Sequence, residues 1–398
     1  MASVDEAMEE RRPLPGGKRD GRGRRAHRSA GRSFLVPVLL LFSAGVFAPP
    51  AESSGSSGGP DLRFSGLFAL RFVYDDNIIH YSEEDLHDFA HIYSPGKFSI
   101  DTAGDWIVRP RLDLTMETEA LTGRDLEIRL RLSSWKYVNN GVKDNESFQL
   151  LLKHPGFGRD NFKLYLYHSP ESYIRNFRDR PPGTPPSDPM EYADFTYVSN
   201  SASLEYWRRI ADSWDGNLEV QRSARYYSRP FMENDNWEWR FGGYLTWRRY
   251  RSFRVRAEYL YSDVLARGAD EVGETRETSD DSDPTYERDS YCVTFSFYPR
   301  GRLGKIDGIS VSGTHQIYYF TTKKSPDEDP YHAGRKDRVY RVEVSGDAGE
   351  VLGPVSLEGG YRFTKRTSTG ALEGEGESIG EEKDYTDNRF WLGFEYPF

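Results

Sequence analysis

The sequence predicts an all-β fold, a transmembrane antiparallel up-and-down β-barrel of about 14 strands, from two patterns that run through most of the chain. Apolar and charged residues alternate in segment after segment, so that each segment has one apolar and one charged face. Long and short connectors alternate between these segments, as in a barrel whose two ends carry loops of different length. A soluble sandwich has no reason to keep that order.

The stretch around 252–263 shows the strand pattern. Phe253, Val255 and Tyr259 fall on one face of an extended chain, whereas Arg254 and Arg256 fall on the other. The same reading of every segment predicts strands over 62–74, 105–119, 125–135, 146–153, 161–168, 199–209, 215–228, 237–248, 252–263, 289–298, 308–320, 337–346, 354–366 and 387–398.

The lengths of the connectors distinguish the two ends of the predicted barrel. The predicted long connectors are 75–104, the Pro-rich 169–198, the acidic 264–288, 321–336 and 367–386. Short turns separate them, and both ends of the predicted barrel fall on the short-turn side. In membrane barrels the short turns face the periplasm and the long loops face outward.

The composition excludes several other classes of protein. Hydrophobic residues make up 37% of the chain and aromatic residues 14%, with a mean hydropathy of −0.74, which is poor in aliphatic residues for helical membrane spans. The net charge of −10 makes nucleic acid an improbable partner. A single cysteine, Cys292, allows neither an intrachain disulfide nor a cysteine-based zinc site. We expect no cofactor and no metal site.

The first 51 residues carry the pattern of a targeting segment. An Arg-rich stretch over 11–33 precedes an apolar run from Phe34 to Ala48, which is short for a spanning helix and typical of a secretory signal. We therefore predict a signal peptide with a long basic n-region over 1–51, a flexible spacer over 52–60 and the outer-membrane β-barrel over 61–398. A retained single-helix anchor is the alternative.

The charged faces of the strands supply the candidate site residues. A charged face inside a barrel either lines a water-filled lumen or forms a salt-bridged core. The predicted pore-lining residues are Arg109, Arg111, Arg129, Arg131, Arg254, Arg256, Glu127, Glu258, Glu358 and Arg362. The first four lie on adjacent predicted strands, and we expect them to form a wall that attracts anions. The alternative is that these charges only neutralise one another across the interior.

The last predicted strand resembles the insertion signal of bacterial outer-membrane β-barrel proteins. Gly393, Tyr396 and the final Phe398 match its pattern, whereas Trp391 stands where that family usually has a polar residue. The segment FVYDDNI over 72–78 also resembles the end of the first strand in uncharacterised, porin-like members. The resemblance implies the outer membrane of a Gram-negative cell. Its implied partners are outer-membrane lipid, lipopolysaccharide and the barrel-assembly machinery, which would read the C-terminal strand.

For function, the resemblance and the charged interior predict a porin-like channel for passive diffusion of small solutes. The alternative is a non-conducting surface barrel whose long acidic loops serve adhesion or scaffolding. We expect no enzyme, because Ser and His are common enough in such a chain that their chance pairing is the default interpretation.

Overall fold

The computed structural model describes residues 62–91, 96–119, 125–156, 160–179, 191–249, 252–271, 273–279, 281–299, 306–370 and 379–398. The predicted signal peptide and spacer, over 1–60, lie outside the described residues.

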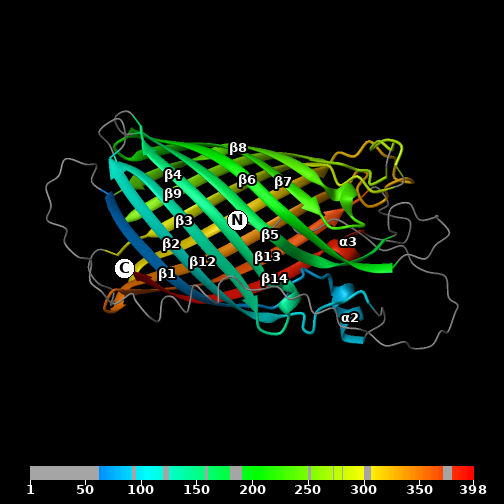
Figure 1. Cartoon of the computed structure of the whole chain (residues 1–398), viewed down its shortest axis with the longest axis horizontal. Helices are drawn as coiled ribbons and strands as arrows, with labels where there is room; N and C mark the ends of the chain where they lie inside the picture. Colours follow the sequence, from blue (N-terminus) through cyan, green and yellow to red (C-terminus); the bar gives the residue numbers. More distant parts are fainter. Residues whose placement is uncertain are drawn as a thin grey trace. The chain divides into compact units, whose positions relative to one another are not determined.

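Fourteen antiparallel strands form one closed barrel (Figure 1), in which each strand pairs with its neighbours in sequence and β1 pairs with β14. This confirms the predicted up-and-down barrel. The strands are β1 Leu62–Asp75, β2 Asp105–Glu119, β3 Asp125–Tyr137, β4 Asn145–Pro155, β5 Asp160–Asp179, β6 Glu191–Ala211, β7 Trp214–Tyr227, β8 Asn236–Arg249, β9 Phe253–Ala266, β10 Tyr286–Phe297, β11 Ile306–Phe320, β12 Lys336–Leu352, β13 Val355–Thr369 and β14 Tyr385–Pro397.

The pair β5 and β6 is much longer than the sequence predicts. The prediction of a loop over 169–198 is wrong for 169–179 and 191–198, which are strand. The β5–β6 register shifts between Ser169 and Ser172 and again after Tyr173, so the alternation of apolar and polar residues breaks there. Beyond this point β5 pairs with β6 alone, because its pairing with β4 ends at His168.

This extension of the β5–β6 hairpin has a small apolar core of its own. Ile174, Phe177, Phe195 and Phe231 are buried against one another, with Phe177 and Phe195 in edge-to-face contact at 5.1 Å between ring centroids. The apolar residues of the extension therefore pack on each other, whereas those of the barrel face outward.

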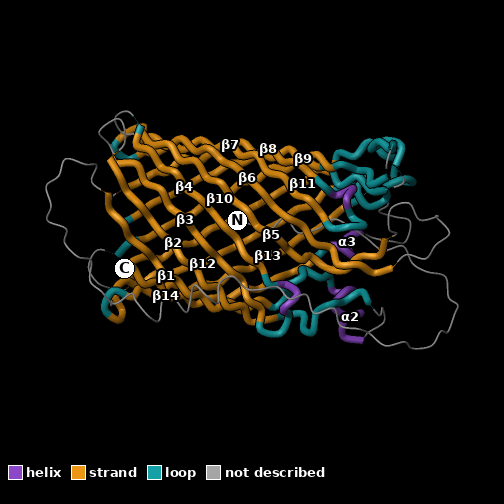
Figure 2. The backbone as a smooth tube through the Cα atoms, in the orientation of Figure 1, coloured by secondary structure: helices purple, strands orange, loops and turns teal. Residues whose placement is uncertain are grey.

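The connectors sort by length, as the sequence predicts. The long connectors gather at one end of the barrel and the short turns lie at the other end, beside the C-terminus (Figures 1 and 2). The long-loop end carries helices α2 Glu83–His91 and α3 Ile379–Lys383 and the single turns η1 Gly141–Lys143 and η2 Met232–Asn234. None of the helices in the described parts of the chain is long and apolar enough to cross a membrane.

Closure between β1 and β14 gives the apolar C-terminal strand its partner. Their register runs from Leu67 opposite Pro397 to Asp75 opposite Arg389. The backbones of Gly66 and Phe398 exchange two further hydrogen bonds, of 2.7 and 2.9 Å, and the Phe398 ring lies over the Cα of Gly66. The strand that would otherwise be an unpaired edge is thus paired on both sides.

One face of the wall is an apolar belt. Large hydrophobic side chains alternate outward along the strands and remain exposed, whereas their sequence neighbours point into the barrel. The belt includes Phe72, Leu114, Leu130, Leu166, Leu204, Leu218, Phe241, Val293, Val311, Val342, Val344, Phe390 and Leu392.

Aromatic rings bound this belt above and below. On the long-loop side, contacting outward pairs include Tyr74–Trp106, Tyr259–Tyr291, His315–Tyr340 and Tyr361–Phe390. On the short-turn side they include Phe162–Tyr206, Trp247–Phe253 and Tyr396–Phe398. Aliphatic residues lie between the two rows. This is the profile of a surface that crosses a bilayer, with amphipathic rings at each interface.

Candidate functional site in the barrel interior

The predicted pore-lining residues all occupy the face opposite the apolar belt. Cross-strand registers place them on the inner side of the wall: Arg109 and Arg111 on β2, Glu127, Arg129 and Arg131 on β3, Arg254, Arg256 and Glu258 on β9, and Glu358 and Arg362 on β13. Because the residues come from distant parts of the barrel wall, they form several separate groups.

The four arginines predicted as one anion-attracting wall are not a continuous cationic surface. Arg131 makes two hydrogen bonds with Asp113, of 2.7 and 2.8 Å. Arg111 contacts Glu395 at 2.8 Å, and Arg129 contacts Glu127 at 2.6 Å. Three of the four therefore have carboxylate partners, and Glu127 also pairs with Lys153 at 2.7 Å.

The predicted residues of β9 have neighbours of two kinds. Arg256 pairs with Glu258 and lies over the Tyr244 ring, 3.5 Å from its centroid. Arg254 lies over the Tyr298 ring at 5.2 Å. This side of the interior combines paired charges with aromatic surface.

A different set of arginines does converge, on the strands around the closure. Arg71 of β1 stands directly opposite Arg109 of β2, and Arg362 of β13 stands directly opposite Arg389 of β14. Arg341 of β12 is one strand further along, on the same inner face. We call these five residues the arginine face. Like charges in opposed cross-strand positions are destabilising, so this arrangement carries a stability cost.

Carboxylates compensate only part of the arginine face. Arg71 donates to Glu358 at 2.6 Å, Arg362 donates to Glu343 at 2.8 Å, and Arg389 pairs with Asp75. Arg109 and Arg341 form no ion pair with any carboxylate of the described residues. Arg109 instead lies flat over Trp135, 3.6 Å from its ring centroid.

Trp391 belongs to this face, which explains its departure from the polar residue of the insertion signal. Its ring lies inside the barrel near the guanidinium groups of Arg71 and Arg362, at 5.8 and 6.0 Å. Gly360 on β13 leaves room for it, because a Cβ there would collide with the Trp391 ring. The polar partners of this tryptophan are interior cations, so it is not a belt residue.

The sequence analysis missed Arg71 and Arg389 as interior residues of this group. Each occupies a charged position of an alternating segment, so its inward direction was readable. Arg71 and Arg389 fall in one group only because β1 pairs with β14, which brings residues more than 300 positions apart side by side.

These observations together show where the protein resides, in a lipid bilayer. A closed wall pairs its backbone groups between neighbouring strands, and an exposed apolar belt between aromatic rows surrounds a charged interior. Only closed barrels and helices satisfy backbone groups within a bilayer. The chain is a membrane-spanning β-barrel.

Comparison with solved structures finds matches at low identity. They include a bacterial polysaccharide outer membrane secretin (9% identity, 83% of this chain and 98% of that chain, TM-score 0.44). The outer membrane channel DcaP of Acinetobacter baumannii is 12% identical, with 86% of this chain and 99% of that chain covered and a TM-score of 0.42. An anion-selective porin from Comamonas acidovorans is 10% identical, with 85% of this chain and 100% of that chain covered and a TM-score of 0.36. No family model and no curated protein matches the sequence.

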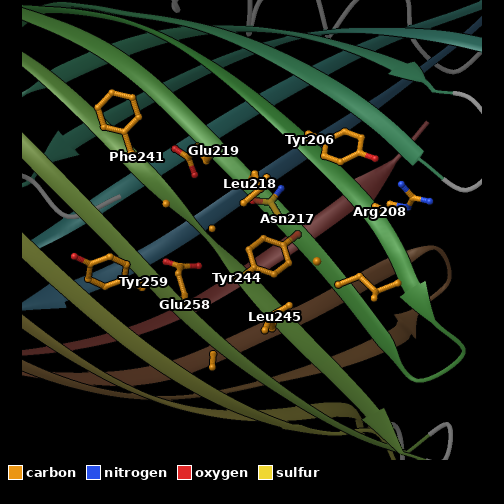
Figure 3. Close-up of a pocket in the computed structure, with 15 residues that line it drawn as sticks. Tyr206, Arg208, Asn217, Leu218, Glu219, Phe241, Tyr244, Leu245, Glu258 and Tyr259 are labelled. Atoms are coloured by element: carbon orange, nitrogen blue, oxygen red, sulfur yellow. The ribbon is translucent and has the colours of Figure 1, made fainter.

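A groove of about 830 Å³ opens on the outer face of this barrel, over β6 to β9 (Figure 3). Its exposed apolar walls are Ile210, Leu218, Phe241, Leu245 and Tyr259. Part of its floor is backbone, because Gly216 and Gly243 lack side chains there. Its lining also includes Glu219, Tyr244 and Glu258.

Alanine at Gly243 will destabilise the barrel, because its Cβ would meet the carbonyl oxygen of Asn217, a backbone atom that cannot rotate away. We expect a loss of about 1–3 kcal/mol in the free energy of unfolding, measured by denaturant titration of the refolded protein. Gly313→Ala is the matched control, since its Cβ meets nothing within 4 Å. Equal stability of the two variants would contradict the close approach of β7 and β8.

Proposed function

We propose that this barrel is a porin-like channel for passive diffusion of small solutes and that it prefers anions. The observation that supports the proposal is the arginine face, on which Arg109 and Arg341 form no ion pair with the described carboxylates. A charge that is not neutralised locally attracts counter-ions from the lumen, whereas a salt-bridged pair has little field beyond its own dipole.

The stability cost of these arginines favours a role in transport over a role in stabilising the barrel. Opposed like charges weaken a sheet, so the positions of Arg71 opposite Arg109 and of Arg362 opposite Arg389 carry a stability cost. A site that holds anions weakly, by several guanidinium groups and without a closed pocket, lets them leave as readily as they enter.

The remaining assignments follow from the membrane setting. The belt contacts outer-membrane lipid, and the outer leaflet brings lipopolysaccharide to the long-loop end. Gly393, Tyr396 and Phe398 would present the C-terminal strand to the barrel-assembly machinery, and the segment over 1–51 would direct export as a signal peptide. The proposal includes no catalytic step and no cofactor.

Single-channel recording in a planar bilayer tests the proposal. The purified, refolded barrel should give reproducible conductance steps, and under a salt gradient the reversal potential should have the sign of anion preference. A folded barrel without steps would overturn the channel. Its interior charges would then be a sealed salt-bridged core, and the adhesion or scaffolding role of the loops would replace it.

A further inference from the structure

Three carboxylates converge where the barrel closes, at its long-loop rim. Asp75 ends β1, Asp76 follows it, and Asp387 lies at the start of β14. One oxygen of each lies within 4.8 Å of the others. We call these three residues the seam carboxylates. Asp75 and Asp387 are almost wholly enclosed, with 1% and 2% of their surfaces exposed, and Asp76 is open to solvent.

A buried oxygen in this group has no donor. Oδ1 of Asp387 is inaccessible to solvent and accepts no hydrogen bond from the described residues. The Oδ2 atom of Asp387 lies 3.9 Å from Nη2 of Arg389 and 3.9 Å from Nε2 of His80, too far for a hydrogen bond in either case. A carboxylate enclosed in this way needs a positive partner at close range.

The net charge of the site matches that of a divalent cation. The seam carboxylates carry three negative charges when ionised, and Arg389, which pairs with Asp75, supplies one positive charge. With His80 neutral, two negative charges remain. Asp105, opposite Asp75 on β2, is not available to add to them, because its oxygens accept hydrogen bonds from Asn139 and Asn140.

Neighbouring groups already orient the seam carboxylates. The backbone N–H of Asn77 donates to Oδ1 of Asp75 at 3.1 Å. The backbone N–H and the side-chain amide of Asn388 donate to the two oxygens of Asp76, each at 2.7 Å. Supporting hydrogen bonds of this kind fix ligand direction at metal sites and leave lone pairs free for the ion.

We propose that Asp75, Asp76 and Asp387 bind one calcium ion that fastens β1 to β14 at the outer rim. Oxygen ligands from three carboxylates suit a hard cation, and an irregular site open to water through Asp76 suits calcium, whose coordination is flexible, better than magnesium. No sequence motif marks the site, because barrel closure brings together residues more than 300 positions apart.

Calorimetric titration of the metal-stripped, refolded full-length barrel with calcium, in a detergent free of lipopolysaccharide, tests the site. We expect saturable binding with an affinity around 1 mM or tighter and a higher thermal midpoint when calcium is present. Asp387→Asn should abolish both effects. Asp76→Asn, at the exposed position, should fold normally and weaken binding by about tenfold or more.

Asp281→Asn is the matched control, because it removes one charge from the acidic group Asp270, Glu274 and Asp281 in the loop between β9 and β10. Its calcium response should equal that of the wild type. The proposal is overturned if wild-type binding survives in both seam variants. It is also overturned if calcium leaves the thermal midpoint unchanged while the midpoint falls with rising pH, since a proton shared by Asp75 and Asp387 would then occupy the site.

Discussion

Replacing Arg109 and Arg341 together with glutamine will reduce the anion preference of the channel by about fivefold. Two unit charges interact by about 1 kcal/mol at 4 Å in water, so removing two lumen charges at somewhat longer range from a passing ion costs it a similar total. Reversal potentials in a salt gradient measure the change. Because neither arginine pairs with a described carboxylate, the substitutions leave no new buried negative charge behind.

The control for this experiment is Arg222→Gln. Arg222 lies over the Trp239 ring on the outer face of the wall, so its loss changes the net charge without changing the lumen. We expect its reversal potential to match that of the wild type. An unchanged potential in the Arg109 and Arg341 double variant would show that these arginines do not set selectivity.

Arginine at Val311 will destabilise the barrel by about 2–4 kcal/mol, because it places a charge at mid-depth in the hydrocarbon. Val311 is an exposed belt residue on β11, between the Phe297 end of the wall and the His315–Tyr340 ring pair. Reversible unfolding in lipid vesicles with increasing denaturant gives the free energy.

The matched control is its neighbour, Ser312→Arg. Ser312 faces the interior and stands directly opposite Glu343 on β12, which Arg362 already contacts. An added guanidinium there shares that carboxylate and stays among the interior charges. We expect a stability change near zero. Similar losses in the two variants would contradict the assignment of the two faces of the wall.

Much of the wall was predictable from local pattern. The alternation around Phe253, Val255 and Tyr259 fixes which residues share a face, and the order of long and short connectors fixes the direction of every strand. The β5–β6 extension was not predictable in this way. Its register shifts break the alternation, and its apolar residues are buried by a partner strand and by Phe231, not by lipid.

The interior arrangement was less accessible than the wall. The sequence identified Arg109 and Arg131 as inward residues. It did not show that Asp113 pairs with Arg131, whereas Arg109 forms no ion pair with a described carboxylate. That outcome depends on register, since Asp113 stands opposite Arg131. The arginine face also depends on closure, which no local window of sequence contains. Pairwise geometry across the barrel, more than residue type, decides which charges are left for function.

The pairing of β1 with β14 also affects the order in which the strands can pair during folding. In this up-and-down barrel thirteen of the fourteen strand pairings join neighbours in the chain, and the pairing of β1 with β14 must wait for the strand made last. Contacts between such distant residues form slowly. During that wait the two edge strands of the unfinished sheet expose unpaired backbone groups. The interval between the synthesis of β1 and of β14 is therefore the period in which an open edge is available to other chains.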